Sequence, residues 1–180
     1  MSRFVALLRA VNVAAQRKLP MAELRALCAE IGWENIQTYI QSGNIVFSAS
    51  GAGGTLEAAL EKAIEARFGF PVDAMVRGAA KWDSLVAANP FPAECETEPN
   101  RVLVYIAKGA TDPGALAAFE ARAVHGERVR QAGEALWIHY PEGAGAKTKL
   151  TTPFVDRAAG SPVTARNWRT VVKLQEMLEA

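Results

Sequence analysis

Apolar and polar positions follow two different periods along the first part of the chain. Residues 4–8 form an uninterrupted apolar run, which is long enough for a buried strand and too short for a buried helix. From Pro20 onward, apolar residues recur every three or four positions as far as Gly32. This spacing predicts an amphipathic helix that ends at the glycine.

The following segments predict a hairpin, a second helix and a further strand. Segments 36–40 and 45–47 are rich in β-forming residues and flank Ser42-Gly43-Asn44, which favours a tight turn. A second amphipathic pattern covers residues 55–69, and residues 72–76 are typical of a strand. The predicted order is β-α-β-β-α-β, the arrangement called ferredoxin-like or split βαβ.

The second half repeats the beginning of this order. After a stretch rich in Pro and Glu, the pattern predicts a strand, a helix and a hairpin, at residues 102–106, 113–123 and 128–140. The two hairpin segments, 41–47 and 131–137, share a Gln, a Gly and their polarity. This echo is weak, but it lies at the same place in both halves and indicates a duplication.

The C-terminal end departs from the repeat. We expect a short helix from about residue 152 and a longer one after Arg166, with Thr164 as an N-cap. The predicted fold class is α+β, with two ferredoxin-like halves whose antiparallel-rich sheets have helices packed on one face, plus C-terminal helices. The expected divisions are an N-terminal half at residues 1–88, a linker at 89–99 and a C-terminal half at 100–180.

Composition excludes several classes of protein. Hydrophobic residues make up 50% of the chain and charged residues 22%, which is typical of folded soluble domains and not of disordered chains. No apolar run approaches the roughly 18–20 residues that span a bilayer, and the N-terminus lacks a signal-peptide core. Cys28 and Cys95 form no C-x-x-C pair, and His125 and His139 fit no ligand spacing. We therefore predict a cytoplasmic protein without a metal, a cofactor or a membrane partner.

Charge is concentrated at the two ends of the chain. Residues 1–25 carry five basic residues and one acidic residue, and residues 147–180 carry six basic and three acidic. The residues between them carry nine basic and fifteen acidic side chains. Either this is ordinary solvated charge, or the two basic ends serve an anionic partner.

Two polar clusters interrupt the apolar patterning of the first half. One follows the first strand, and the other lies at the hairpin; their candidate ligand-binding residues are Arg9, Asn12, Lys18, Gln41, Ser42 and Asn44. In a β-α-β-β-α-β unit the first two strands are parallel, so both clusters are expected at the same end of the sheet. A structural interpretation stays open, because Asn and Gly also serve tight turns.

A third cluster is C-terminal and contains the candidates Lys147, Lys149, Arg166 and Asn167. Glycines precede the lysines, but their spacing is not that of a nucleotide-binding P-loop. If the two basic ends of the chain meet, Arg9 and Arg166 are expected to share one ligand.

These segments resemble a known family. The resemblance is carried by residues 7–13, 21–25, 38–47, 147–151 and 164–171, of which Q-S-G-N and R-N-W are the most specific parts. They are similar to the domain-of-unknown-function 1697 family over essentially the whole chain. Ala10, Ala14 and Ala15 stand where that family usually has glycines, and Arg169 stands where it often has Asn. The resemblance implies a bacterial α+β protein with ferredoxin-like halves and implies no established activity.

Three functional hypotheses follow. The clusters contain Arg, Lys, Asn, Gln, Ser and Thr without a carboxylate or a His, which suits charge-assisted hydrogen bonds to an anion better than proton transfer. The first hypothesis is thus a protein that binds a phosphorylated or other anionic ligand, including nucleic acid. The second is a small-molecule enzyme acting by electrostatic stabilisation, with Lys18, Lys147 or Lys149 as the reactive group. The third is a structural homodimer.

Overall fold

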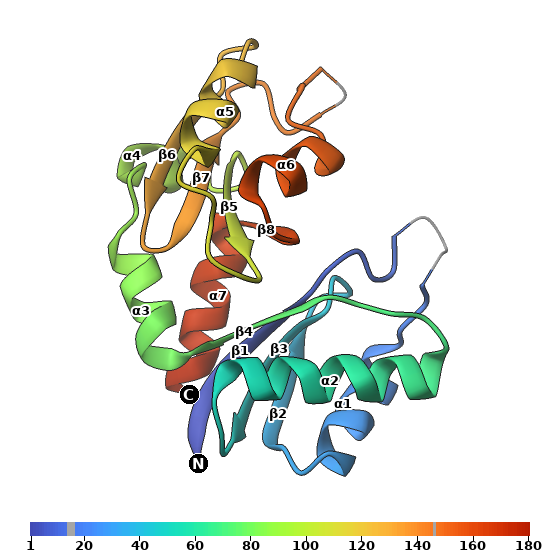
Figure 1. Ribbon diagram of the computed structural model, residues 1–180. Coiled ribbons are helices and arrows are strands. Elements are labelled where there is room, and N and C mark those ends of the chain that lie inside the picture. The colour runs from blue at the N-terminus through green and yellow to red at the C-terminus, as the bar shows by residue number, and fades with distance from the viewer. Residues whose placement is uncertain (14–16, 146) are drawn as a thin grey trace. The chain divides into compact units, whose positions relative to one another are not determined.

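The computed structural model describes residues 1–13, 17–145 and 147–180, which form two compact units (Figure 1). The first unit contains Met1–Asp83 and Leu174–Ala180, and the second contains Ser84–Lys173. The predicted bounds of the two halves, 1–88 and 100–180, stay a prediction. The predicted linker at 89–99 contains a helix in the structure, α4 (Pro92–Thr97).

The first unit has the predicted ferredoxin-like topology. Its elements are β1 (Ser2–Leu8), α1 (Met21–Glu30), β2 (Glu34–Tyr39), β3 (Asn44–Ala49), α2 (Gly53–Phe68) and β4 (Ala74–Gly78). The strands form one sheet in the order β2-β3-β1-β4, and every neighbouring pair is antiparallel. Strands β1 and β2 are therefore parallel to each other, and the segments that follow them start at the same end of the sheet.

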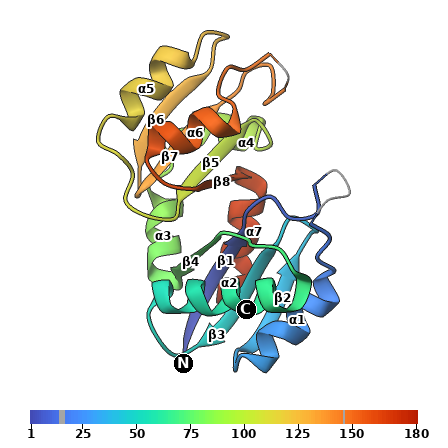
Figure 2. The same cartoon turned by 45° about the vertical axis from the view of Figure 1, so that its right-hand side comes forward.

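The core of this unit explains its sequence pattern. α1 and α2 lie on the same side of the sheet (Figure 2), where Leu24, Leu60 and Ile64 pack against alternate residues of β1 and β3. Residues 4–8 of β1 are all buried, which is why this strand is apolar throughout instead of alternating. α2 ends at Gly69 in the left-handed conformation, as its pattern predicts.

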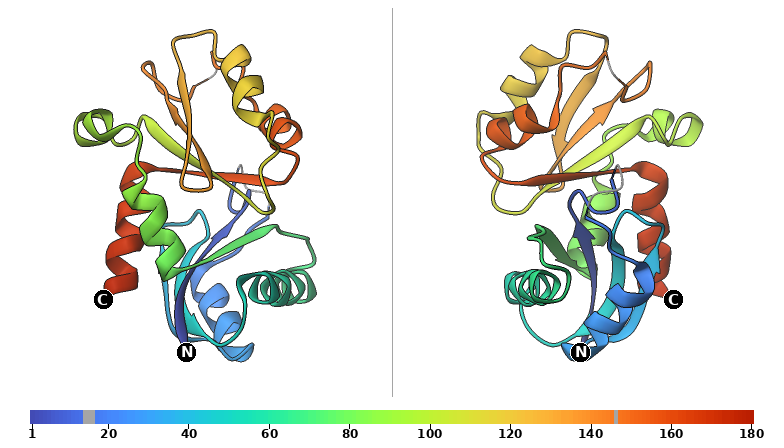
Figure 3. Two further views of the ribbon diagram at one scale, coloured as in Figure 1. Left: turned by 60° about the vertical axis from the view of Figure 1, so that its left-hand side comes forward. Right: turned by 90° about the vertical axis from the view of Figure 1, so that its right-hand side faces the viewer.

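The second unit has the same topology as the first. Its sheet contains β5 (Val102–Ala107), β6 (Arg128–Ala132), β7 (Ala135–His139) and β8 (Val163–Asn167), in the order β6-β7-β5-β8. α5 (Ala115–Arg122) and α6 (Thr152–Ala159) lie on the same side of this sheet (Figure 3) and cover a core around Phe119 and Ile138. The α+β class with two antiparallel sheets and packed helices is thus confirmed.

The end of the second half differs from the prediction. Residues 163–167 form the edge strand β8, so the second half is a complete β-α-β-β-α-β unit and Thr164 is not an N-cap. The longer C-terminal helix is α7 (Trp168–Glu179), which starts directly after β8. A matching helix, α3 (Ala79–Ala87), follows β4 and had no counterpart among the predicted elements.

Equivalent arginines support a duplication. Arg77 of β4 lies opposite Val5 of β1, and Arg166 of β8 lies opposite Val104 of β5. Each guanidinium donates its Nη1–H to the carbonyl of the preceding residue at 2.9 Å. The same side chain thus makes the same contact at the same position of both sheets, immediately before a helix.

Candidate functional site

The loop after β1 meets the β2–β3 hairpin at one end of the first sheet. The Leu8 amide donates to the Gly43 carbonyl at 2.8 Å, and the Arg9 amide donates to the Asp73 carbonyl at 3.0 Å. The Asn12 side chain donates to the Gln41 carbonyl at 2.8 Å. The structure therefore brings the first two sequence clusters together. We call this region the sheet-end cluster, defined by Arg9, Asn12, Lys18, Gln41, Ser42 and Asn44.

Asn12 fastens the loop to the hairpin. Besides its bond to Gln41, its Nδ2 donates to the Leu19 carbonyl at 2.9 Å, and its Oδ1 accepts from the Leu19 amide at 2.8 Å. Both amide hydrogens and the carbonyl oxygen of the side chain are thus used inside the protein. Asn12 is a positioning residue, which fixes the backbone on either side of the cluster.

Asn44 and Ser42 stabilise the hairpin from within. Asn44 is fully buried, and its Nδ2 donates to the Tyr39 carbonyl at 3.0 Å and to the Ser42 Oγ at 2.9 Å. Between them, Gly43 has a φ of +75°, and a Cβ at this position would lie 2.7 Å from the Leu8 Cβ. The Q-S-G-N motif therefore allows the hairpin backbone to approach the end of β1 closely.

Backbone strain is concentrated in this region. Among the described residues, six that are not glycine have a left-handed backbone, and four of them lie here: Ala10, Asn12, Arg17 and Ile40. Ile40 is also β-branched and half exposed, a combination that disfavours this conformation strongly. Ala10 has a left-handed backbone, which explains why the family usually has a glycine at this position. The other two alanines at family glycine positions, Ala14 and Ala15, lie outside the described residues.

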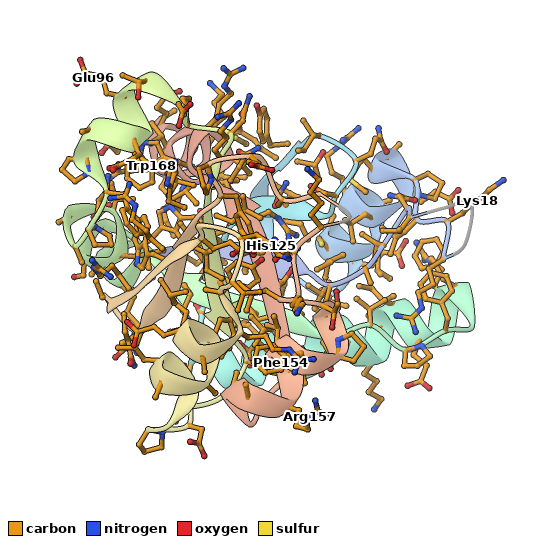
Figure 4. All side chains as sticks on the ribbon, turned by 90° about the horizontal axis from the view of Figure 1, so that it is seen from above. Lys18, Glu96, His125, Phe154, Arg157 and Trp168 are labelled. Carbon is orange, nitrogen blue, oxygen red and sulfur yellow. The ribbon has the colours of Figure 1, made fainter. Side chains whose placement is uncertain are left out.

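The cationic side chains in the cluster and next to it have different surroundings. Arg9 is partly buried and forms an ion pair with Asp73 at an Nη1–Oδ2 distance of 3.5 Å. Arg17 and Lys18 are exposed, and Lys18 projects outward from the loop (Figure 4). Gln41 is exposed as well. The cluster therefore presents hydrogen-bond donors to solvent. The side-chain amides of Asn12 and Asn44 hold the backbone that carries these donors in place.

The predicted C-terminal lysines lie on the surface of the second unit. Lys147 and Lys149 are exposed, and Lys147 pairs with Glu142 at 3.5 Å. Thr148 between them turns inward and donates to a carboxylate oxygen of Glu127 at 2.8 Å. Desolvation raises the pKa of Glu127, but the bonds from Thr148 and from backbone amides outweigh it and lower that pKa below its ordinary value.

Arg166 and Asn167 have structural contacts in the second unit. Arg166 is buried and donates to the Thr164 Oγ1 at 2.7 Å, and burial lowers the pKa of its guanidinium to about 10. Asn167 caps α7 by accepting from the Thr170 amide at 2.9 Å. The hypothesis that Arg9 and Arg166 share one ligand stays a prediction, because they belong to different units.

A polar network in the second unit was missed by the sequence analysis. His139 of β7 is 6% exposed and lies 3.1 Å from a carboxylate oxygen of Glu98 through its Nε2. Its Nδ1 lies 3.3 Å from a guanidinium nitrogen of Arg128, which also pairs with Glu94. Arg128 only donates, so the Nδ1 accepts and the Nε2–H donates to Glu98. The sequence carries no signal for this contact, because Glu98 and His139 are far apart in the chain.

An open pocket adjoins this network. It has a volume of about 320 Å³ and is lined by Thr97, Glu98, Pro99, Asn100, Arg101 and Arg169. Arg101 donates to the second carboxylate oxygen of Glu98 at 2.9 Å. None of these lining residues was among the predicted site residues.

In the parts of the chain that the structure describes, no group of three or more His, Cys, Asp or Glu side chains is placed to hold a metal ion. No helix in these parts of the chain has the length and apolar character needed to cross a membrane.

Comparison with known proteins supports the fold and the family. The conserved bacterial protein SP0830 from Streptococcus pneumoniae has a similar structure, with a TM-score of 0.79 and 24% sequence identity over 98% of both chains. At this identity, the similarity shows the fold alone. No protein with a curated description matches the chain. The family model described as "Protein of unknown function (DUF1697)" matches residues 1–137, which include the sheet-end cluster and end before the C-terminal motifs. The chain belongs to this family.

Proposed function

We propose that the protein binds a small phosphorylated or otherwise anionic ligand at the sheet-end cluster. In this proposal, Arg9, Lys18 and Gln41 contact the ligand, whereas Asn12, Ser42 and Asn44 hold the two loops in register. Charged and amide N–H groups from separate loops suit the several oxygens of a phosphate group.

The observation that carries the proposal is the concentration of left-handed residues around the cluster. Each such residue costs on the order of 1–3 kcal/mol, and such costs gather where a protein holds groups in a functional geometry. Ala10, Asn12 and Arg17 bear that cost within one loop, and Ile40 bears it in the facing hairpin. A loop that only connects β1 to α1 does not require strained residues both in the loop itself and in the facing hairpin.

The charge distribution supports an anionic ligand. Residues 1–25 carry a net charge of +4, although the whole chain carries only +1. Arg9 and Lys18 belong to this basic segment, and the Nη1–Oδ2 distance of 3.5 Å between Arg9 and Asp73 lies at the outer limit of a hydrogen bond. Because Lys18 is exposed and Arg9 is only partly buried, binding is expected to weaken with salt.

Calorimetric titration with inorganic pyrophosphate tests the proposal. The variant Arg9→Ala/Lys18→Ala is compared with Lys62→Ala/Arg157→Ala, which also removes two surface cations. Loss of two charged hydrogen bonds, each worth about 1.5–3 kcal/mol, predicts at least a roughly 100-fold weaker affinity for the first variant only. Equal losses in both variants would show a nonspecific charge effect and contradict the proposal.

A titration with a short single-stranded oligonucleotide distinguishes the two sources of phosphate. A small-molecule site predicts that pyrophosphate binds the wild type at least as tightly as the oligonucleotide does, and that it competes with it. Tight oligonucleotide binding that pyrophosphate does not displace would assign the cluster to nucleic acid instead. Absence of both interactions would reject anion binding at this site.

A further inference from the structure

We propose that the pocket of the second unit is a separate binding site for a small organic anion that also carries a hydroxyl group, such as a phosphate ester of a polyol. The site consists of Arg101, Arg169, Asn100 and Glu98. It lies in the second unit, whereas the sheet-end cluster lies in the first, and none of its residues is among the candidate ligand-binding residues named from the sequence.

The pocket has the volume of a small-molecule site and a polar, charged lining. Its volume of about 320 Å³ lies at the lower end of the range for ligand pockets. Two guanidinium groups, an amide, a hydroxyl and a carboxylate line it. This composition provides both hydrogen-bond donors for an oxyanion and an acceptor for a neutral donor on the same molecule.

Arg169 supplies uncompensated positive charge. It lies in the first turn of α7, and among the described residues it has no ion pair or side-chain hydrogen bond. Its neighbour Trp168, labelled in Figure 4, donates its backbone N–H to the Pro99 carbonyl at 3.2 Å. This bond fixes the start of α7 against the loop that forms the opposite wall of the pocket.

Arg101 is held in place on that wall. Its Nη1 donates to the Glu98 carboxylate and to the Pro141 carbonyl, at 2.9 and 2.5 Å. A guanidinium fixed by two acceptors loses less conformational entropy when it binds a ligand. Its remaining N–H groups keep the capacity to donate to an oxyanion, because a guanidinium has five donors.

Glu98 is oriented by the polar network that contains the buried His139. Its two carboxylate oxygens accept from Arg101 and His139, and His139 in turn accepts from Arg128. Phe91 packs near both His139 and Arg128, at 6.2 and 5.3 Å from its ring centroid. Each carboxylate oxygen can accept a second hydrogen bond, and the side chain of Glu98 is 38% exposed. A ligand hydroxyl therefore has an acceptor of fixed orientation.

The charges of the pocket and its network favour one anion. Arg101 pairs with Glu98 and Arg128 pairs with Glu94, so that, with His139 left out of the sum, the charge of Arg169 remains as one excess positive charge. A bound oxyanion beside Arg169 compensates that charge. The same arrangement explains why Glu98 does not repel the ligand, since its charge is shared between Arg101 and the His139–Arg128 pair.

Amide NMR spectra recorded during titration with glycerol 3-phosphate test the proposal. We expect saturable shifts at Thr97, Asn100, Arg101 and Arg169, and Arg169→Ala should weaken the affinity that these shifts report about 10- to 100-fold. Arg157→Ala, which removes an exposed cation of α6, is the matched control and should change the affinity less than 2-fold. Absence of these shifts in the wild type, or equal affinity in Arg169→Ala, would overturn the proposal.

Two further comparisons test the role of Glu98 and separate the two sites. Propyl phosphate, which lacks the hydroxyls, should bind several-fold more weakly than glycerol 3-phosphate, and Glu98→Gln should reduce that preference. Equal binding of the two esters would contradict the assigned role of Glu98. Arg9→Ala/Lys18→Ala should leave the shifts around Asn100 unchanged. The proposal for the pocket can therefore be rejected while the proposal for the sheet-end cluster stands, and the reverse. Loss of those shifts in this variant would show that the pocket is not a separate site.

Discussion

Gly43 is the residue at which conformation and close packing are both required. Its φ is +75°, and an added Cβ would lie 2.7 Å from the Leu8 Cβ and 2.8 Å from the Val11 Cγ2. Both neighbours are buried, so neither can move without disturbing the core. Gly43→Ala therefore combines the cost of a left-handed alanine with overpacking, and we expect a loss of about 2–5 kcal/mol in the free energy of unfolding.

Gly32 provides the matched control for this prediction. Its φ is +87°, but no atom lies within 4 Å of the position that a Cβ would take. Gly32→Ala should therefore cost only the backbone term, about 1–2 kcal/mol. Urea unfolding of both variants measures the difference. Equal losses would mean that the hairpin does not approach β1 as closely as described.

For single residues, the sequence predicts a local role, such as a turn, better than it predicts hydrogen-bond partners. Ser42-Gly43-Asn44 is recognisable as a turn, and both the left-handed Gly43 and the buried Asn44 agree with a turn role. The bonds of Asn12 to Leu19 and Gln41 are not predictable, because they join two loops through one side chain. The contact of His139 with Glu98 depends on the fold in the same way.

Thr148 links the segment before α6 to the start of β6. Its hydroxyl donates to Glu127 at 2.8 Å and also accepts from the Leu150 amide at 3.2 Å. The pKa of Glu127 in the folded protein lies below its ordinary value of 4.5. Its ionised form therefore stabilises the fold above about pH 4.5, and this contribution is lost as the pH falls through the folded-state pKa.

Thr148→Val removes that hydroxyl and should reduce the pH dependence. We expect a loss of about 1.5–3 kcal/mol in the free energy of unfolding at neutral pH, because the hydrogen bond goes to a charged group. The difference from the wild type should shrink below pH 4.5, while Thr148→Ser should resemble the wild type at every pH. Urea unfolding at several pH values measures the difference in the free energy of unfolding between Thr148→Val and the wild type. A difference that does not change with pH would contradict the role of Glu127.

Element prediction succeeds where periodicity is long and fails where elements are short and polar. The apolar run of β1 and the periodic pattern of α2 leave little choice of structure. β8, in contrast, contains Thr164, Arg166 and Asn167, which resemble a helix cap when they stand before the periodic α7. Its pairing with β5 is long-range, and this pairing is what makes the segment a strand.

The two units show why the duplication is weak in sequence but clear in structure. Equivalent sheets need the same pattern of buried positions and not the same residues. Identical residues therefore remain only at turns and at a few side-chain contacts with the backbone. Gly43 and Gly133 both have positive φ at the hairpins. Arg77 and Arg166 make the same backbone contact in equivalent strands. The first two polar clusters met as expected because the topology was predicted correctly.

The most direct test of anion binding at the sheet-end cluster is a crystal structure grown with selenate, whose anomalous scattering locates each bound anion. The account predicts a peak within hydrogen-bonding distance of Arg9 or Lys18 and next to Gln41, which disappears when the crystal is soaked in pyrophosphate and is absent in Arg9→Ala/Lys18→Ala. Selenate found only elsewhere, for example only beside Arg101 and Arg169, would contradict the proposed function.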